Sequence, residues 1–216
     1  MNKKKQVKTT LIIARHGNTF APGDIITRVG KTDLPLVDSG LEQGRNIGAY
    51  LKKHDLIPDI IFTSDLKRTQ QTAEQAVNEM HAKPFLESLS IFNEIDYGPD
   101  ENQPEEKVVA RLGSDAIKAW DDDAAVPDGW NVNPQKIIHN WRQFSKLIHT
   151  EYPGSIVMVV TSNGIARFAP HITGDFDGFR SQHKIKIATG ALCIFEHENS
   201  SENWHCVHWN MKPESA

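Results

Sequence analysis

Short runs of apolar residues divide the chain into predicted strands. Leu11–Ala14, Ile60–Thr63 and Ile156–Val160 are rich in β-branched residues and end at polar residues. Runs that are apolar on both faces are typical of buried, parallel strands. Two later runs, Ala191–Glu196 and His205–Trp209, predict strands joined by a polar hairpin loop.

Helical periodicity fills the intervals between these strands. Apolar residues recur every three or four positions over residues 39–54 and 65–80, which predicts two amphipathic helices. Ser64 or Asp65 is placed to cap the second helix. Asn133-Pro134 predicts another helix start, a cap followed by a first-turn proline, and one more helix is expected to begin near Gly164.

This alternation predicts an α/β fold, a three-layer α/β/α sandwich around a mostly parallel sheet with an antiparallel edge strand. The 216 residues are enough for one well-buried domain. The segment from about 97 to 133 is rich in Pro, Asp and Gly around one helical stretch at about 104–120. We interpret it as a helical lobe inserted into a single domain, 1–216.

Composition and charge limit the partners and the cellular location that we expect for the protein. The formal net charge of -4 gives no general attraction to nucleic acid or to an anionic membrane. The apolar run at Leu11–Ala14 is too short for a signal peptide or a membrane span. Cys193 and Cys206 match neither a metal-ligand spacing nor a secreted disulfide framework. We expect a cytoplasmic protein with neither membrane nor nucleic-acid partners, and the oligomeric state stays open.

Polar residues follow three of the predicted strands, at 15–19, 63–68 and 161–164. Ligands of open α/β sheets bind outside the carboxyl ends of the strands. Arg15 and Arg68 carry planar forks of donors that suit phosphate or carboxylate, and Arg68 lies in the first turn of a helix, where an anion is favoured. These features predict a phosphate site, in which a nucleophilic His16 implies phosphoryl transfer.

These strings resemble the histidine phosphatase superfamily, also called the phosphoglycerate-mutase-like family. The resemblance rests on Arg-His-Gly-x-Thr at 15–19 and on Ser-x-Leu-x-Arg-x-x-Gln-Thr-Ala at 64–73. Residues 93–98 resemble the family's acidic segment and 159–167 its last active-site strand. The resemblance implies a three-layer α/β/α fold and catalysis through a phosphohistidine, with no metal or other cofactor.

The resemblance also implies roles for the matching residues. His16 is expected to be the nucleophile, with its ring tautomer fixed by a hydrogen bond. Arg15 and Arg68 are expected to hold phosphate oxygens, and Asn18 and Thr19 to add neutral hydrogen bonds. A hydrogen-bonded structural histidine is the alternative for position 16.

Glu94 matches the residue that protonates the leaving alkoxide and then takes a proton from the attacking water. Asp96, Asp100 and Glu101 lie close by in the sequence. They remain alternatives for the proton donor.

The family pattern Val-x-His-Gly supplies a second histidine after the last of these strands. Aligning Gly164 and Arg167 to the pattern places Ser162 at that histidine, so we expect Ser162 to contact phosphate without charge, or merely to complete the strand end. Losing a charge-assisted hydrogen bond costs on the order of 1–2 kcal/mol, roughly ten- to thirtyfold in rate. Candidates for a compensating cation are Arg28, Arg167, Arg180, His183 and Lys186.

The leading functional hypothesis is a hydrolase that acts on small phosphomonoesters through His16. A phosphoglycerate-mutase-type phosphotransferase is the first alternative, but such mutases carry Trp-Asn soon after Arg-His-Gly, where this chain has Phe20-Ala21-Pro22-Gly23. A catalytically weak protein that binds a phosphorylated ligand is the second, because the second histidine is missing. The retained nucleophile, arginines and acid favour hydrolysis.

Overall fold

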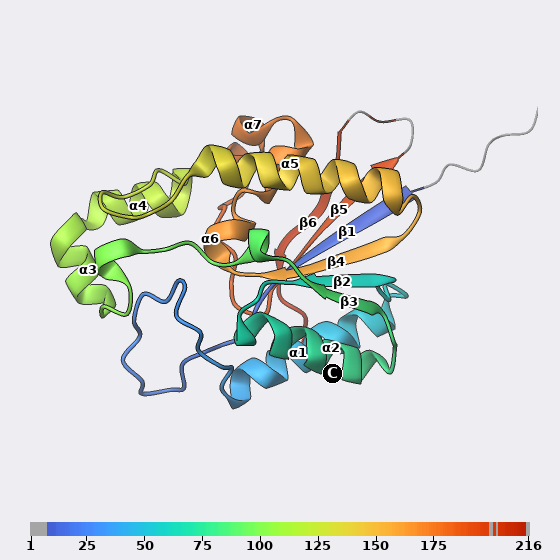
Figure 1. Cartoon of the computed structure of the whole chain (residues 1–216), viewed down its shortest axis with the longest axis horizontal. Coiled ribbons are helices and arrows are strands. Elements are labelled where there is room, and N and C mark those ends of the chain that lie inside the picture. Colours follow the sequence, from blue (N-terminus) through green and yellow to red (C-terminus); the bar gives the residue numbers. More distant parts are fainter. Residues whose placement is uncertain (1–7, 199–200, 202, 215–216) are drawn as a thin grey trace, which may run out of the picture.

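The computed structural model of the chain describes residues 8–198, 201 and 203–214, and it contains one central sheet (Figure 1). The strand order within this part of the chain is β3-β2-β4-β1-β5-β6. The strands are β1 (Lys8–Arg15), β2 (Ile60–Thr63), β3 (Phe85–Ser88), β4 (Ile156–Thr161), β5 (Leu192–Glu198) and β6 (His205–Met211). The pairs β3-β2, β2-β4 and β4-β1 are parallel, whereas β5 runs antiparallel to both β1 and β6. The predicted sheet, mostly parallel with an antiparallel edge, is confirmed.

Helices cover both faces of this sheet, which confirms the three-layer prediction. Helices α1 (Asp38–Lys53) and α2 (Lys67–Met80) pack on one face, and α5 (Pro134–Glu151) lies across the other (Figure 1). The remaining elements are shorter: the 3₁₀ turns η1 (Ser90–Phe92), η2 (Gly98–Asp100) and η3 (Ala169–Thr173), and the helices α3 (Glu105–Leu112), α4 (Ser114–Asp123), α6 (Asn163–Ala166) and α7 (Phe176–Gln182).

Alternation along the buried strands produces two hydrophobic cores. In β1, Leu11 and Ile13 pack toward α5, and Ile12 and Ala14 pack toward α1 and α2. All four side chains are fully buried. A strand with both faces buried must be apolar at every position, which is why period-two alternation is absent from its sequence.

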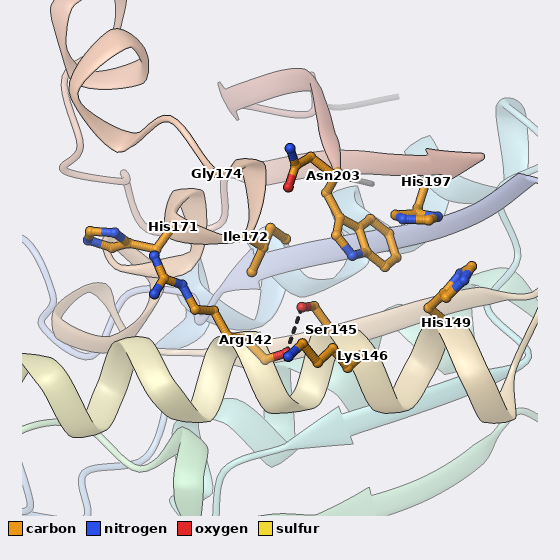
Figure 2. A pocket seen from close by; sticks show the side chains of 10 residues that line it. Arg142, Ser145, Lys146, His149, His171, Ile172, Gly174, His197 and Asn203 are labelled. Atoms are coloured by element: carbon orange, nitrogen blue, oxygen red, sulfur yellow. Dashed lines mark hydrogen bonds between the residues drawn. The ribbon is translucent and has the colours of Figure 1, made fainter. Parts of the chain in front are cut away.

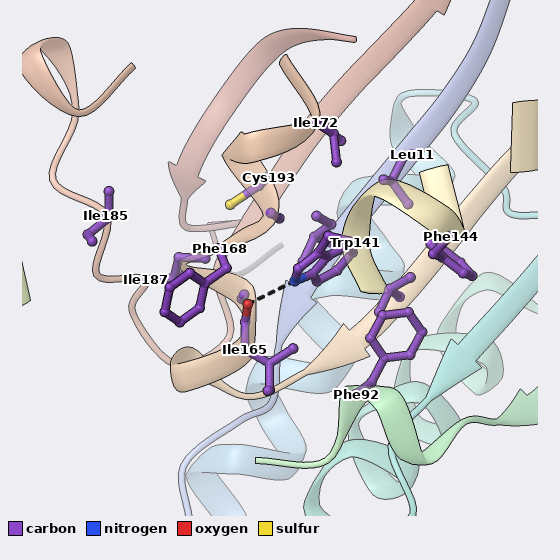
Figure 3. Packing of buried hydrophobic residues seen from close by; sticks show 14 of the residues in the cluster. Leu11, Phe92, Trp141, Phe144, Ile165, Phe168, Ile172, Ile185, Ile187 and Cys193 are labelled. Atoms are coloured by element: carbon purple, nitrogen blue, oxygen red, sulfur yellow. Dashed lines mark hydrogen bonds between the residues drawn. The ribbon is translucent and has the colours of Figure 1, made fainter. Parts of the chain in front are cut away.

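Trp141 is the central side chain of α5 in the first of these cores (Figure 3). Its ring lies 5.1 Å from that of Phe92, and its Nε1 donates a hydrogen bond to the Ile165 carbonyl at 2.9 Å. This bond ties α5 to α6, the short helix that follows β4.

Two of the predicted boundaries were wrong. The helical stretch at about 104–120 is two helices, because Gly113 adopts φ 83° between α3 and α4. Neither Ser64 nor Asp65 caps α2, which begins at Lys67; instead the Asp33 carboxylate accepts the Lys67 N–H at 2.7 Å. The predicted cap of α5 is confirmed, since Asn133 accepts the Lys136 N–H at 3.0 Å.

Residues 97–133 contain η2, α3 and α4 and lie beside the carboxyl end of the sheet (Figure 1). Trp120 and Trp130 of this segment are buried, with ring centroids 5.3 Å apart. The interpretation of the segment as a lobe inserted into a single domain stays a prediction. Within the described ranges, no helix combines the length and the apolar character needed to cross a bilayer.

We predict that Trp141→Ala lowers the free energy of unfolding by about 3–5 kcal/mol, because it leaves a cavity in the core and an unpaired Ile165 carbonyl. Urea unfolding followed by circular dichroism measures this loss. Leu147→Ala on the same helix is the control, since Leu147 is 47% exposed and its truncation should change stability by less than about 0.5 kcal/mol. Equal effects of the two substitutions would contradict the central position of Trp141.

Candidate active site

Three strand ends meet at one edge of the sheet, as the sequence predicts. Arg15 at the end of β1 pairs with Thr161 at the end of β4, and Thr63 of β2 pairs with Val160. A cavity of about 720 Å³ opens at this edge. The residues from the predicted site that line it are Arg15, His16, Asn18, Thr19, Arg68 and Glu94.

His16 lies in the wall of this cavity and is only 6% exposed. Its Nδ1 lies 2.7 Å from the Gly17 carbonyl oxygen. Because a carbonyl can only accept, Nδ1 must carry the proton, which leaves a lone pair on Nε2. Burial, followed by the charges of Arg15 and Arg68, holds the pKa of His16 well below its usual value. The ring is therefore neutral at neutral pH, the form that a nucleophile requires.

Gly17 allows the loop after β1 to pack directly against the start of α1. A Cβ atom at Gly17 would lie 2.3 Å from the Gly40 carbonyl oxygen, closer than atoms can approach. The Gly17 N–H donates to Thr72 Oγ1 of α2 at 3.0 Å. The position of His16 is thus fixed by both helices on this face of the sheet.

The two arginines are held by backbone carbonyls rather than by carboxylates. Arg15 Nη1 donates to the Ile187 carbonyl at 2.5 Å, and Arg68 donates to the carbonyls of Thr32 and Gly30, both at 2.7 Å. Burial lowers the pKa of each guanidinium, while the Coulombic attraction of Glu94 opposes that shift. Neither arginine forms an ion pair with a carboxylate in the part of the chain that is described, so both charges are available to an anion.

Glu94 reaches the cavity from the loop between η1 and η2. Its Oε2 accepts the Gly164 N–H at 3.0 Å, and its Oε1 accepts the Ile95 N–H at 2.9 Å. A Cβ atom at Gly164 would lie 2.3 Å from Glu94 Oε1. Only glycine at position 164 permits this approach of the carboxylate to the backbone.

The three alternative carboxylates point elsewhere. Asp96 pairs with Lys31 at 3.0 Å, Asp100 pairs with Arg111 and Trp130, and Glu101 accepts from the Gly30 and Thr32 N–H groups. None of the three lines the cavity. The geometry therefore favours Glu94 over these three residues as the proton donor.

Asn18 and Thr19 line the cavity next to His16. Asn18 Oδ1 accepts a hydrogen bond from Thr189 Oγ1 at 2.5 Å, and Asn18 Nδ2 lies 3.2 Å from Ser39 Oγ. Thr189 also lines the cavity, and no pattern in the sequence singles it out.

Of the two readings of Ser162, the structure fits the residue that completes the strand end and gives no support to a phosphate contact. Its side chain is fully buried, is absent from the cavity lining, and its Oγ has no hydrogen-bond partner among the described residues. The neighbouring Asn163 lines the cavity instead, and its Oδ1 accepts the Ile187 N–H at 2.9 Å. The pattern Val-x-His-Gly has the histidine directly before the glycine, so Gly164 aligns position 163 with it. Of these two adjacent residues only Asn163 lines the cavity, which makes it the better candidate for the second histidine position.

Two of the five candidate cations, Arg28 and Lys186, line the cavity. Arg28 pairs with Glu105, and its guanidinium lies 5.5 Å from the Tyr97 ring centroid. Lys186 pairs with Asp121 at 2.7 Å.

The other three candidate cations lie outside the cavity lining. Arg167 is fully buried, with its guanidinium 4.0 Å from the Trp120 ring centroid. Arg180 pairs with Asp123 at 2.6 Å, and His183 packs against Phe179.

Tyr97 also lines the cavity, although it was not among the predicted site residues. It is buried, and burial together with the charge of Glu94 raises the pKa of its hydroxyl. Its position within the acidic segment 93–98 was the one available signal.

Comparisons with known proteins find relatives over most of the chain. The family model for the histidine phosphatase superfamily (branch 1) matches residues 11–212. A Bacillus subtilis (strain 168) protein named uncharacterized phosphatase PhoE is 40% identical over 215 residues, which cover 94% of this chain and 95% of that protein. A 2,3-bisphosphoglycerate-dependent phosphoglycerate mutase from Rhodococcus jostii (strain RHA1) is 30% identical over 114 residues, only 51% of this chain and 44% of the mutase.

Solved structures share the fold at low sequence identity. A mycobacterial glucosyl-3-phosphoglycerate phosphatase superposes with a TM-score of 0.75 at 17% identity, covering 94% of this chain and 99% of its own. YhfR of Bacillus stearothermophilus superposes with a TM-score of 0.76 at 18% identity, covering 94% and 97%.

The lowered pKa of His16 predicts a pH dependence of stability. Below the ordinary pKa of 6.5 the unfolded chain binds a proton at this ring and the folded chain does not, so the free energy of unfolding falls as pH decreases from about 6.5. The contribution has a slope of up to about 1.4 kcal/mol per pH unit. We expect His16→Asn to flatten the curve by this amount, measured by urea unfolding between pH 7 and pH 5.

Comparing the original protein with the His16→Asn variant isolates the contribution of His16 from those of the other histidines. The pKa values of His171 and His197 are also lowered by burial, and their contributions are common to both proteins. Parallel curves for the two proteins would show that the His16 ring is protonated in the folded state.

Proposed function

The chain belongs to the histidine phosphatase superfamily, and on that premise we propose that it hydrolyses small phosphomonoesters through a phosphohistidine intermediate on His16. The observation that carries the proposal is the hydrogen bond from Nδ1 of His16 to the Gly17 carbonyl, which leaves the Nε2 lone pair free in a cavity wall shared with Arg15 and Arg68.

In the first step, His16 Nε2 attacks the phosphorus atom and the bond from phosphorus to the ester oxygen breaks. Arg15 and Arg68 neutralise the phosphoryl oxygens in the transition state, with Asn18, Thr19 and Asn163 as neutral donors. Their carbonyl partners hold both guanidinium groups before substrate arrives, so little reorganisation is needed. Glu94 acts as the general acid that gives a proton to the departing alkoxide.

In the second step, water attacks the phosphorus atom of the phosphohistidine and the bond to Nε2 breaks. Glu94, now a carboxylate, takes the proton from that water. Inorganic phosphate leaves, and His16 returns to its neutral tautomer. The backbone N–H groups of Ile95 and Gly164 hold the Glu94 carboxyl group in one orientation through both steps.

Hydrolysis is favoured over mutase chemistry by the comparisons and by the residues after Arg-His-Gly. PhoE is similar over nearly the whole chain, whereas the mutase match covers about half of it. Phe20, Ala21 and Pro22 line the cavity where the family's mutases carry Trp-Asn. A protein that only bound phosphorylated ligands would have no use for a neutral imidazole beside a carboxyl group.

The substrate has an organic part larger than its phosphate, because the cavity of about 720 Å³ extends well beyond His16. Its outer wall includes Phe20, Ile26 and Val29, together with the Arg28–Glu105 ion pair. We propose that this wall selects the substrate. Both cysteines are free thiols, which suits the cytoplasmic location that the sequence predicts.

Independence from metal ions stays a prediction. Over residues 8–198, 201 and 203–214, no group of three or more His, Cys, Asp or Glu side chains is arranged to hold a metal ion.

We expect pure protein to hydrolyse a generic aryl phosphate and to form an acid-labile phosphoryl adduct. His16→Ala should abolish the adduct and lower kcat by at least about a thousandfold, and Glu94→Gln should lower kcat about 100- to 10,000-fold. Radiolabelled phosphate with acid and base quenching detects the adduct. Turnover without an adduct, or an adduct that survives in His16→Ala, would contradict the proposed nucleophile. Transfer of phosphate to phosphoglycerate at a rate above hydrolysis would favour the mutase.

We predict that Asn163→His raises kcat/KM roughly ten- to thirtyfold on the same ester, because a charged donor replaces a neutral one. A charged ring donates from both nitrogens, so the Ile187 N–H loses the acceptor that Asn163 Oδ1 supplies now.

Ser162→His is the matched control for that substitution. It should destabilise the fold without raising the rate, because residue 162 is fully buried. Activation by Ser162→His rather than by Asn163→His would reverse our assignment of the two positions.

A further inference from the structure

A second cavity, of about 310 Å³, lies between α5, η3 and β5 (Figure 2). His197 of β5 and His149 of α5 are in its lining. His197 pairs with Thr9 near the start of β1, seven positions before His16, which is about 23 Å of strand. This cavity therefore lies toward the edge of the sheet opposite the candidate active site.

The lining of the second cavity is rich in nitrogen-bearing side chains, of which Arg142 and Lys146 are cations. Five of its side chains carry basic nitrogens: Arg142, Lys146, His149, His171 and His197. No Asp or Glu residue is among the described residues that line it. The negative charge that acts on His171 is that of Asp177, which is itself paired with Arg180 at 3.0 Å.

Two ring nitrogens in this lining have unsatisfied hydrogen-bonding capacity. Nδ1 of His149 and Nδ1 of His197 are buried and have no partner in the part of the chain described. His197 is only 5% exposed, and the two ring centroids lie 4.2 Å apart. Buried polar atoms without partners are costly in native proteins, and a bound molecule is a common reason for them. Burial and the neighbouring His149 both lower the pKa of His197, so its neutral ring offers a hydrogen bond rather than a charge.

A metal ion fits this cavity poorly. The two imidazoles would be its protein ligands, and no set of three or more His, Cys, Asp or Glu side chains in the described ranges is arranged to hold a metal ion. The guanidinium of Arg142 and the ammonium of Lys146 would also repel a cation. The charge of the lining favours an anion.

We propose that this cavity is a binding site for a small multivalent oxyanion, a phosphate or carboxylate compound. Arg142 and Lys146 supply the charge at its exposed side, and His149 and His197 supply hydrogen bonds at its buried side. Trp204 and Ile172, both buried, provide an apolar wall for a short organic part. The site goes beyond the phosphatase reaction and does not depend on it, since it shares no residue with the cavity around His16.

The full chain, labelled at its histidine rings, is titrated separately with inorganic phosphate and with citrate up to roughly 10 mM and followed by nuclear magnetic resonance. Signals of His149 and His197 are assigned from His149→Gln and His197→Gln. We expect both signals to shift saturably. The double substitution Arg142→Gln, Lys146→Gln should weaken binding at least about tenfold, since it removes two charge-assisted contacts.

Two controls make the experiment decisive. Lys52→Gln with Lys53→Gln removes the same charge from exposed positions at the end of α1, on the other face of the sheet, and should leave the affinity within about twofold. The His16 signal should respond to phosphate in every variant. A shift with one anion alone identifies its class, and shifts with both support a general oxyanion site. Absence of saturable shifts at His149 and His197 would mean that water alone satisfies the two rings. Equal affinity in the variant that lacks Arg142 and Lys146 would place the anion elsewhere. Either result overturns the proposal.

Discussion

One hydrogen bond determines what the candidate active site can do. It runs from His16 Nδ1 to the carbonyl oxygen of Gly17, the next residue, over 2.7 Å. Without it, either ring nitrogen could carry the proton, and Nε2 would not always present a lone pair for attack. Two adjacent guanidinium groups and burial keep the ring neutral, so the same surroundings that attract an anion also preserve the lone pair. The contact of Gly17 with Gly40 and Thr72 then fixes this carbonyl relative to α1 and α2.

Backbone atoms position most of the charged side chains around His16. Carbonyl groups of residues 30, 32 and 187 orient the two arginines, and N–H groups of residues 95 and 164 orient Glu94. A carbonyl oxygen orients a guanidinium without cancelling its charge, whereas a carboxylate partner would compete with the incoming phosphate. The ion pairs that line the cavity, Arg28–Glu105 and Lys186–Asp121, involve neither Arg15 nor Arg68.

The sequence predicted the elements whose physical signal is local. Buried parallel strands must be apolar throughout, and the cap at Asn133 is read from two adjacent residues, so both were found.

The strand β3 was missed because its four residues are exposed and carry no burial pattern. The cap of α2 was missed because Asp33 reaches it from a distant loop. At the strand end after β4 the sequence could not distinguish two adjacent residues: Ser162 is fully buried, whereas Asn163 lines the cavity. Thr189 and Tyr97 join the site through tertiary contacts that no local pattern records.

Two segments that are far apart in the sequence, residues 28–32 and 101–105, are hydrogen-bonded to each other beside the cavity. Arg28 N–H donates to the Gln103 carbonyl at 2.9 Å, Asn102 N–H donates to the Arg28 carbonyl at 2.7 Å, and Glu101 accepts from both Gly30 and Thr32. An insertion or deletion in either segment would therefore displace the other. In evolution, related chains that acquire new leaving-group preferences should accumulate length changes in the two segments together, while isolated point substitutions on the Phe20, Ile26 and Val29 surface remain tolerated.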